Sequence, residues 1–272
     1  MSNQQNVTTL AEYKPFTLPA PMDASFKADD LAEDLEGLEL SFPRVKIPGG
    51  VPQFKMPGED PDHPSFVSEI EGIILYNHSA NACWPEGSEY DDNTPPQCQS
   101  MDGIQGYGNP GLLCEACGNN QFGSSGKGKL CKNMRMLYIL RSGDAIPLEL
   151  SLPPTSIKPF KNFVNMSFAL RRRPVYGSIV KITLKPVSSN GFDYSVACFT
   201  RARDLTGDEL AGVKAYAENF RVMVKASLEQ RAQEQETAGA IIQTTGSPVE
   251  LPDNDDHFAV GVLDGERELL PA

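Results

Sequence analysis

Apolar and polar residues alternate through much of the middle of the chain, which is the pattern of half-buried β-strands. The clearest case is residues 175–203, VYGSIVKITLKPVSSNGFDYSVACFTRAR, which alternate on both sides of Asn190-Gly191. Asn-Gly between two such runs is a strong signal for a β-hairpin. Residues 69–84 form one long apolar run, and residues 134–153 contain two strand-like runs around a Ser-Gly-Asp turn. The pattern therefore predicts a protein built mainly from β-strands.

Two segments have the three- and four-residue spacing of helices instead. Residues 154–173 place a Thr or Ser ahead of four apolar positions, with Pro159 in the first turn, which predicts a helix of about three turns. A second helix is expected over residues 204–238, because Thr206 and Glu209 have the spacing of a capping box and apolar residues recur along one face. We expect this apolar face to dock on the sheet or to pair with another helix.

Four of the six cysteines fall in a segment that is poor in apolar residues and rich in turn formers. Cys98, Cys114, Cys117 and Cys131 have the spacing C-x15-C-x2-C-x13-C. Four thiolates can close a tetrahedral shell around Zn²⁺, and a CxxC pair supplies two of them from one tight turn. Because the segment cannot bury a core of its own, a metal is a physical reason for it to be ordered. The spacing therefore predicts a structural Zn²⁺ site, with plain burial of reduced thiols as the alternative.

Other interpretations of the cysteines are less well supported. Cys198 alternates within a strand like a small core residue, and Cys83, close to His78, is left outside the metal shell because four better candidates exist. A redox pair requires a βαβ unit around the CxxC, which the pattern lacks. The run GSSGKGK has the spacing of a phosphate loop, but Leu130 stands where Ser or Thr must hold Mg²⁺.

The formal net charge of −12 conceals a basic centre. Both ends of the chain are acidic, whereas residues 127–203 hold fourteen Lys or Arg against only Asp144, Glu149 and Asp193. A basic stretch of this kind is the footprint of a surface that meets phosphates. The alternative is a solvated face whose charges pair with acids from elsewhere in the fold.

Single-stranded nucleic acid is bound by cations that meet its backbone and by aromatic rings that stack on its bases. The basic stretch offers both kinds of side chain, although many of its aromatic residues are expected in the core because strands alternate between two faces. The candidate contacts are Lys127, Lys129, Lys132, Arg135, Tyr138, Lys158, Lys161, Arg171, Arg172, Arg173, Tyr176 and Arg201.

The predicted order of strand, long excursion, two strands, helix and two strands is close to that of an OB-fold. The predicted fold class is thus mainly β (α+β): an OB-fold-like barrel with a zinc-ribbon-like insertion, a C-terminal helix and disordered acidic tails. An acidic disordered arm is expected at residues 1–40, and an OB-like domain at 41–203 with its zinc insertion at 95–133. An amphipathic helix is expected at 204–238 and an acidic disordered tail at 239–272.

Six motifs follow one another along the chain in the order FPRVKIPGG, EGIILYNHSANACW, PPQCQSMDG, CEACGNNQFGS, GKGKLCKNMRMLYILRSGDAIPLELSLPPTSIKPF and VYGSIVKITLK. Together they resemble a family encoded by bacteriophages, prophages and integrative elements. The resemblance covers about residues 42–203. It implies a single-stranded DNA-binding protein of phage replication or recombination, with an OB-like domain and zinc on the four spaced cysteines. Cys83 stands where this family has an aromatic residue.

The leading expectation is therefore a non-enzymatic protein that binds single-stranded DNA. The alternative is a zinc-containing protein-interaction module, such as a regulator or an inhibitor of host defence. A nuclease using Asp91, Asp92 and Asp102 is a third hypothesis, but no paired carboxylate motif supports it.

The ends of the chain add expectations about partners and location. The acidic C-terminal tail is expected to occupy the basic groove or to recruit replication or recombination proteins, and the alternative is that it only keeps the protein soluble. A homo-oligomer is left open. Since the N-terminus is polar and no run of eighteen apolar residues occurs, an intracellular location is expected. The resemblance to a bacteriophage family implies the cytoplasm of a bacterial host cell.

Overall fold

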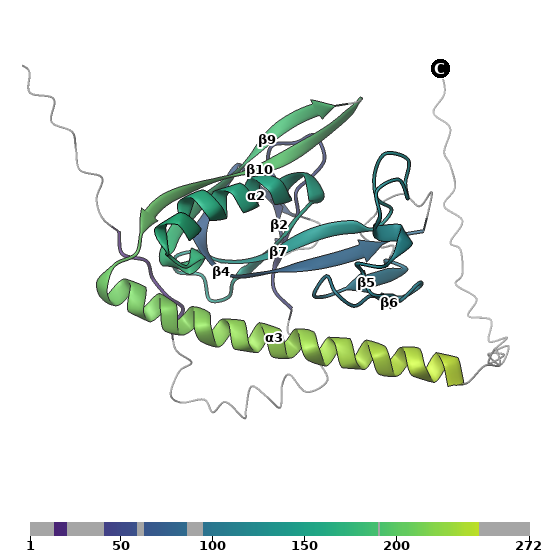
Figure 1. Cartoon of the computed structure of the whole chain (residues 1–272). Helices are drawn as coiled ribbons and strands as arrows, with labels where there is room; N and C mark the ends of the chain where they lie inside the picture. The colour runs from purple at the N-terminus through teal and green to yellow at the C-terminus, as the bar shows by residue number, and fades with distance from the viewer. Residues whose placement is uncertain (1–13, 21–40, 59–62, 86–94, 190, 245–272) are drawn as a thin grey trace, which may run out of the picture.

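The chain forms a mixed α+β structure, rich in strands, around one curled sheet (Figure 1). The computed structural model describes residues 14–20, 41–58, 63–85, 95–189 and 191–244. Most of the two segments expected to be disordered tails therefore lies outside the described residues. No helix among those described is both long and apolar enough to cross a lipid bilayer.

Ten strands, two α-helices and three short 3-10 turns make up the described residues. The strands are β1 (Arg44–Val45), β2 (Phe54–Met56), β3 (Ser65–Val67), β4 (Glu69–Cys83), β5 (Cys98–Ser100), β6 (Tyr107–Gly108), β7 (Lys132–Leu140), β8 (Leu148–Leu152), β9 (Ser178–Ser189) and β10 (Phe192–Asp204). The helices are α2 (Pro154–Ser167) and α3 (Gly207–Thr244), and the turns are η1 (Gly118–Asn120), η2 (Ala169–Arg171) and η3 (Val175–Gly177).

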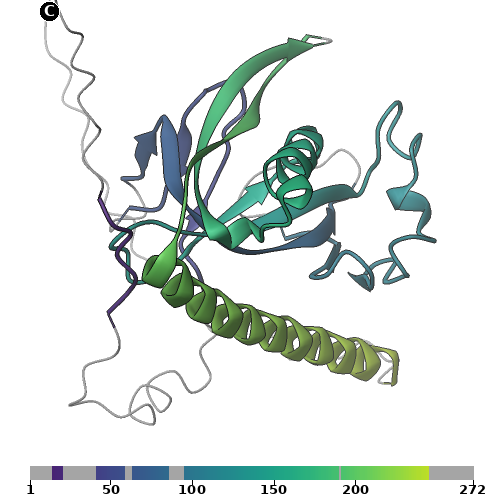
Figure 2. The same ribbon diagram turned by 60° about the vertical axis from the view of Figure 1, so that its left-hand side comes forward.

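The long strand β4 lies at the centre of the sheet. Its first four residues pair with β9 and residues 73–82 pair with β7, both antiparallel, with a register shift between Ile74 and Tyr76. β8 then adds to β7, and β10 adds to β9, so that the sheet curls into a half-barrel (Figure 2). The predicted hairpin is confirmed, with Gly191 in its turn at φ +78°.

Strand alternation gives the half-barrel an inner and an outer face. On β7, Leu137 and Ile139 point into the inner core, whereas Tyr138 and Leu140 belong to a second core on the outer face. The inner core also takes apolar residues from every other long strand and from α2: Ile70, Ile74, Leu148, Leu150, Leu152, Phe160, Phe168, Val180, Ile182, Leu184 and Ala197.

Helix α2 lies along the side of the half-barrel that the strands leave open. It packs against β10, β7 and β8. The strands β8 and β10 lie at the two sides of this opening and do not pair with each other. The buried Ser156 hydroxyl on α2 accepts a hydrogen bond from the Ala197 N–H at 2.9 Å. Further along β10, the Ser195 hydroxyl donates to the Val51 carbonyl oxygen at 2.9 Å. Side chains and helix packing therefore protect an edge that a neighbouring strand would otherwise cover.

Helix α3 covers the outer face, which confirms the expected docking of its apolar side. Val213, Ala217, Phe220 and Val224 are buried against outer-face residues of β4 and β7. The helix extends to Thr244, beyond the predicted end at residue 238.

The N-terminal segment at residues 14–20 joins the same outer core. Phe16 is buried there, and its N–H donates to the Glu209 carboxylate at 2.7 Å. Glu209 also forms an ion pair with Arg203 at 2.6 Å. The prediction of a disordered arm is therefore wrong for these residues, because a buried aromatic side chain and a backbone hydrogen bond hold them to α3.

Substitutions on the docked and the exposed face of α3 should have different effects on stability. Phe220 packs edge-to-face on Phe42 and Tyr138, with ring centroids 5.4 Å apart in both pairs. We expect Phe220→Ala to lower the free energy of unfolding by about 3–4 kcal/mol in urea titrations, since it leaves a cavity. Val222 on the same helix is 69% exposed, so Val222→Ala should change stability by less than about 0.5 kcal/mol. Equal effects of the two substitutions would contradict this docking.

Candidate nucleic-acid interface and cysteine cluster

The excursion between β4 and β7 brings five of the six cysteines to one small cavity. Cys83 ends β4 and lies directly opposite Cys98 on β5. Cys114 and Cys117 precede the turn η1, and Cys131 immediately precedes β7. All five line the same cavity of about 10 Å³, which has room for about one small ion or water molecule. The four predicted ligands are thus brought together, and Cys83, which the spacing argument excluded, joins them. Cys198 lies apart, on β10.

The donor set suits a soft metal, although the thiols are not in a ligating arrangement. Within the described ranges, no three His, Cys, Asp or Glu side chains have a geometry that could hold a metal ion. The cavity lining consists of thiols with amide, hydroxyl and apolar groups and includes no carboxylate. Burial and the neighbouring thiols raise the pKa of Cys131 to about 12, and burial raises the pKa of Cys98. A bound Zn²⁺ would therefore have to displace thiol protons and draw the sulfurs inward.

Hydrogen bonds of the backbone and of polar side chains order this turn-rich module in place of an apolar core. The Asn119 carbonyl oxygen accepts the Cys131 N–H at 2.9 Å, and the Asn120 side-chain amide donates to the Cys114 carbonyl oxygen at 2.7 Å. The Ser124 hydroxyl accepts the Leu130 N–H at 2.9 Å. Ser124 belongs to the run GSSGKGK, which has the spacing of a phosphate loop. The polar side chains of the module hold the cysteine turns together.

A basic groove lies next to this module, on the outer face of β7 and β8. Its floor includes Met134 and Ser151, whose side chains are in contact at 3.4 Å on the face opposite the inner core. The groove has a volume of about 460 Å³, and among the described residues no acid lines it. Its lining residues are Arg44, Val45, Lys46, Ile47, Pro48, Gly49, Lys55, Trp84, Lys132, Met134, Ser151, Pro153 and Pro154.

Four cations and the only tryptophan of the chain meet in this groove. Lys46 and Lys55 are held side by side because their backbones exchange two hydrogen bonds of 3.0 Å. Trp84 follows the last residue of β4, and Lys132 is the first residue of β7. An indole ring among cations can receive a base while phosphates meet the positive charges. One of these cations, Arg44, also lies 3.9 Å from the Glu149 carboxylate.

The cationic surface continues from the groove onto the cysteine module. The Lys132 ammonium donates to the Lys129 carbonyl oxygen at 3.4 Å, and the Lys129 ammonium lies 5.1 Å from the centroid of the Phe122 ring. Phe122 is 81% exposed, and Lys127 is exposed on the same turn. Phe122 is therefore a second aromatic ring beside cations, one that the sequence analysis did not select.

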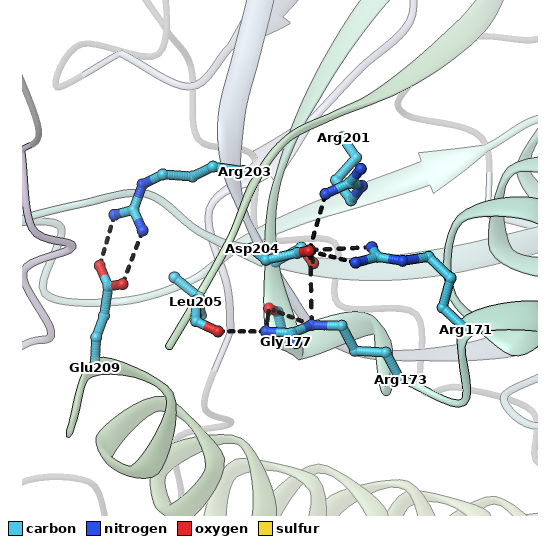
Figure 3. A network of polar contacts seen from close by, with 9 residues as sticks. Arg171, Arg173, Gly177, Arg201, Arg203, Asp204, Leu205 and Glu209 are labelled. Atoms are coloured by element: carbon cyan, nitrogen blue, oxygen red, sulfur yellow. Dashed lines mark hydrogen bonds and ion pairs between the residues drawn. The ribbon is translucent and has the colours of Figure 1, made fainter. Parts of the chain in front are cut away.

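Three of the predicted phosphate contacts are instead engaged by one carboxylate (Figure 3). The guanidinium groups of Arg171, Arg201 and Arg173 approach Asp204 at 2.5, 3.0 and 3.7 Å. The Ser178 hydroxyl also donates to Asp204, at 2.6 Å. The hydrogen bond from Arg171, with smaller contributions from Ser178 and the other arginines, holds the Asp204 pKa well below its usual range. These arginines therefore follow the alternative interpretation, in which the basic residues pair with acids of the fold itself. Asp204 is not among the acids counted in the basic stretch 127–203, because it lies one residue beyond it.

Two predicted aromatic contacts and one arginine lie inside the fold. Tyr138 is only 4% exposed beneath α3, and Tyr176 is half-buried in the same outer core. The Arg135 guanidinium donates to the side chains of Asn77 at 2.7 Å and of Ser79 at 3.0 Å. Tyr138 is thus closed to a base, whereas Arg135 and Tyr176 are partly buried and line a separate pocket of about 230 Å³.

The remaining predicted cations are exposed but do not line the groove. Lys158 and Lys161 lie on α2, and Arg172 follows η2. Of the twelve predicted contacts only Lys132 lines the groove. Sequence reasoning missed Trp84 and three cations, Arg44, Lys46 and Lys55. A signal was present, since residues 44–55 carry these three cations and no acid.

The Asp204 network predicts a pH-dependent loss of stability in Asp204→Asn. Because the folded pKa of Asp204 is depressed, its contribution to stability is complete above the unfolded value of about 4 and is lost as pH falls below it. We expect Asp204→Asn to cost about 1–2 kcal/mol in urea unfolding at neutral pH, with the difference from wild type shrinking below about pH 4. Asp193→Asn, at an exposed hairpin position, should have little effect at any pH. A pH-independent difference would contradict the assigned network.

Comparison with protein-family models, with curated proteins and with solved structures finds no match for this chain. The functional assignment therefore depends on the groove, the cysteine cavity and the topology described above.

Proposed function

We propose that this protein binds single-stranded DNA through an open OB-like barrel. The elements β4, β7, β8, α2, β9 and β10 follow the OB order of three strands, a helix and two strands, and the strands neighbour one another as β8-β7-β4-β9-β10. In OB-folds, oligonucleotides bind across the second and third strands, flanked by the loops after the first and fourth. By this correspondence the binding face is the outer face of β7 and β8. The cysteine module is then the loop after the first strand, and the β9–β10 turn is the loop after the fourth.

The observation that carries the proposal is the groove on that face. Arg44, Lys46, Lys55 and Lys132 line it together with Trp84, and no acid is among its described lining residues. Cations in such a groove neutralise phosphates, and an aromatic ring that stacks on a base contributes about 1–3 kcal/mol whatever the base. Phe122 beside Lys129 extends the same chemistry onto the module.

The proposal includes a structural Zn²⁺ ion in the cysteine cavity. Trp84 directly follows Cys83, and Lys132 directly follows Cys131, so two groove residues are attached to cavity cysteines. A metal that fixes these cysteines would also fix the ring and the cation on the groove side. The resemblance in the motifs adds the expected setting, which is replication or recombination of phage or mobile-element DNA.

The acidic C-terminal tail is proposed to compete for the groove or to recruit replication and recombination proteins. Its residues from 245 onward lie outside the described residues. Their net acidic charge complements the cations of the groove.

A specific observation also favours the alternative, a protein-interaction module. Ile104, Leu112 and Leu113 are exposed on the cysteine module, where the Ile104 carbonyl oxygen accepts the Cys114 N–H and Gln105 bridges to Leu113. Neighbouring exposed apolar residues suit a protein partner. For the nuclease hypothesis, Asp102 is engaged by Ser100 and by backbone N–H groups of its own turn, while Asp91 and Asp92 lie outside the described residues.

Titration with a labelled oligo-dT tests the DNA-binding proposal. Wild-type protein should bind at about 50 mM salt, with the logarithm of affinity falling linearly against the logarithm of salt concentration. Replacing both Lys46 and Lys55 by Ala should reduce that slope by about 1.4, and Trp84→Ala should weaken binding by about 1–3 kcal/mol. The matched control replaces Lys158 and Lys161, exposed cations outside the groove, and should leave the slope unchanged. Absence of binding at low salt would refute the proposal and favour the protein-interaction module.

Removal of zinc should loosen the cysteine module without unfolding the barrel. Since Trp84 is the only tryptophan, its fluorescence reports on the junction between cavity and groove. We expect a chelator to change this fluorescence and weaken oligo-dT binding, while the β-sheet signal in circular dichroism is retained. Restoration of both readouts by added Zn²⁺ is the control, and loss of the β-sheet signal would show that the barrel itself needs the metal.

A further inference from the structure

Five cysteine thiols line the cavity. A structural Zn²⁺ ion binds only four ligands, so one of these thiols lies outside the metal shell. We infer that Cys83 is a ligand, together with Cys114, Cys117 and Cys131, and that Cys98 is the cysteine outside the shell. This assignment rests on the proposed zinc site and differs from the set that the spacing predicts. Its spacing in the chain is C-x30-C-x2-C-x13-C.

Strand order places Cys83 in the middle of a row of three cysteines. Cys83 on β4 lies directly opposite Cys98 on β5. On the other side, Ala82 pairs with Lys132, so the next antiparallel positions, Cys83 and Cys131, face each other where β4 ends and β7 begins. Since the backbones of adjacent strands are about 4.8 Å apart, the backbones at Cys98 and Cys131 are separated by about 9–10 Å along this row. A metal held by Cys131 therefore meets Cys83 before it can reach Cys98.

Burial ranks the five thiols in the same way. Cys83 is 1% exposed, and Cys114, Cys117 and Cys131 are also buried, whereas Cys98 is only partly buried. A structural zinc site is a closed site without a bound solvent molecule. The most exposed thiol of the five is thus the least suited to it.

Hydrogen-bond donors surround the Cys83 sulfur. The Gln97 and Asn119 side-chain amides approach it at 3.5 and 3.8 Å. Amide donors to sulfur form the outer shell that orients metal-bound thiolates. Asn119 also accepts the Cys131 N–H, so one residue links Cys83 to Cys131.

The experiment measures zinc content and zinc affinity in full-length variants by competition with a chromophoric chelator. We expect Cys83→Ser to lower zinc affinity by more than about 100-fold, since it removes a ligand. Cys98→Ser should keep one Zn²⁺ per chain with affinity within about 3-fold of wild type. Cys198→Ser, on β10 and away from the cavity, is the matched control. Loss of zinc from Cys98→Ser, or its retention at wild-type affinity in Cys83→Ser, would overturn the assignment.

A second measurement on wild-type protein avoids any folding defect in the variants. Native alkylation followed by mass spectrometry should label Cys98 at the same rate before and after chelation, because no metal covers it. Cys114, Cys117 and Cys131 should become labelled only after the chelator is added. Protection of Cys98 by zinc would contradict the inference. Wild-type protein that binds no zinc would overturn both the zinc site and this assignment, whereas the oligo-dT titration judges DNA binding independently.

Discussion

The pairing of β4 with two different partners is the constraint on which the rest of the structure depends. Its first four residues pair with β9 and its residues from Ile73 onward pair with β7, and a register shift between Ile74 and Tyr76 interrupts the β7 pairing just after this change of partner. A strand shared by two halves of a twisted sheet has to bend, and a bulge increases the local twist. Gly72 precedes the bulge, where a Cβ atom would lie 2.5 Å from the Leu140 carbonyl oxygen. The half-barrel therefore depends on one bulge and one close approach of two backbones.

The two faces created by this curl are covered by different helices. α2 fills the open side and covers the inner core, while α3 packs on the outer face over Tyr138 and Leu140, at the end of β7. The beginning of β7 is different, because Lys132 and Met134 line the groove. On the outer face, one end of the strand thus contributes to stability through α3 and the other end remains accessible to a ligand.

The strands and helices could be predicted because their signals are local. Alternation and the Asn190-Gly191 turn identify the hairpin, and the spacing of apolar residues identifies α3. The candidate site could be predicted only in part, because it depends on non-local pairing. Nothing near Arg171 in the chain indicates that Asp204 will bind it, and the alternation that contains Tyr138 fits either face until α3 is placed. The metal prediction relied on sequence spacing and therefore favoured cysteines within one segment, whereas strand register brings Cys83 to the same cavity.

Alternation at the ends of β4 and β7 explains why the cavity and the groove are neighbours. Successive residues of a strand point to opposite faces, so Cys83 and Trp84 diverge, as do Cys131 and Lys132. In each pair the cysteine lines the cavity and the next residue lines the groove. A metal bond to the cysteine of a pair would restrict the backbone that also carries the neighbouring Trp84 indole or Lys132 ammonium. Ordering these groups in advance would reduce the entropy cost of the proposed binding of DNA. The cysteine module is therefore better understood as the support of one wall of the groove than as an independent appendage of the barrel.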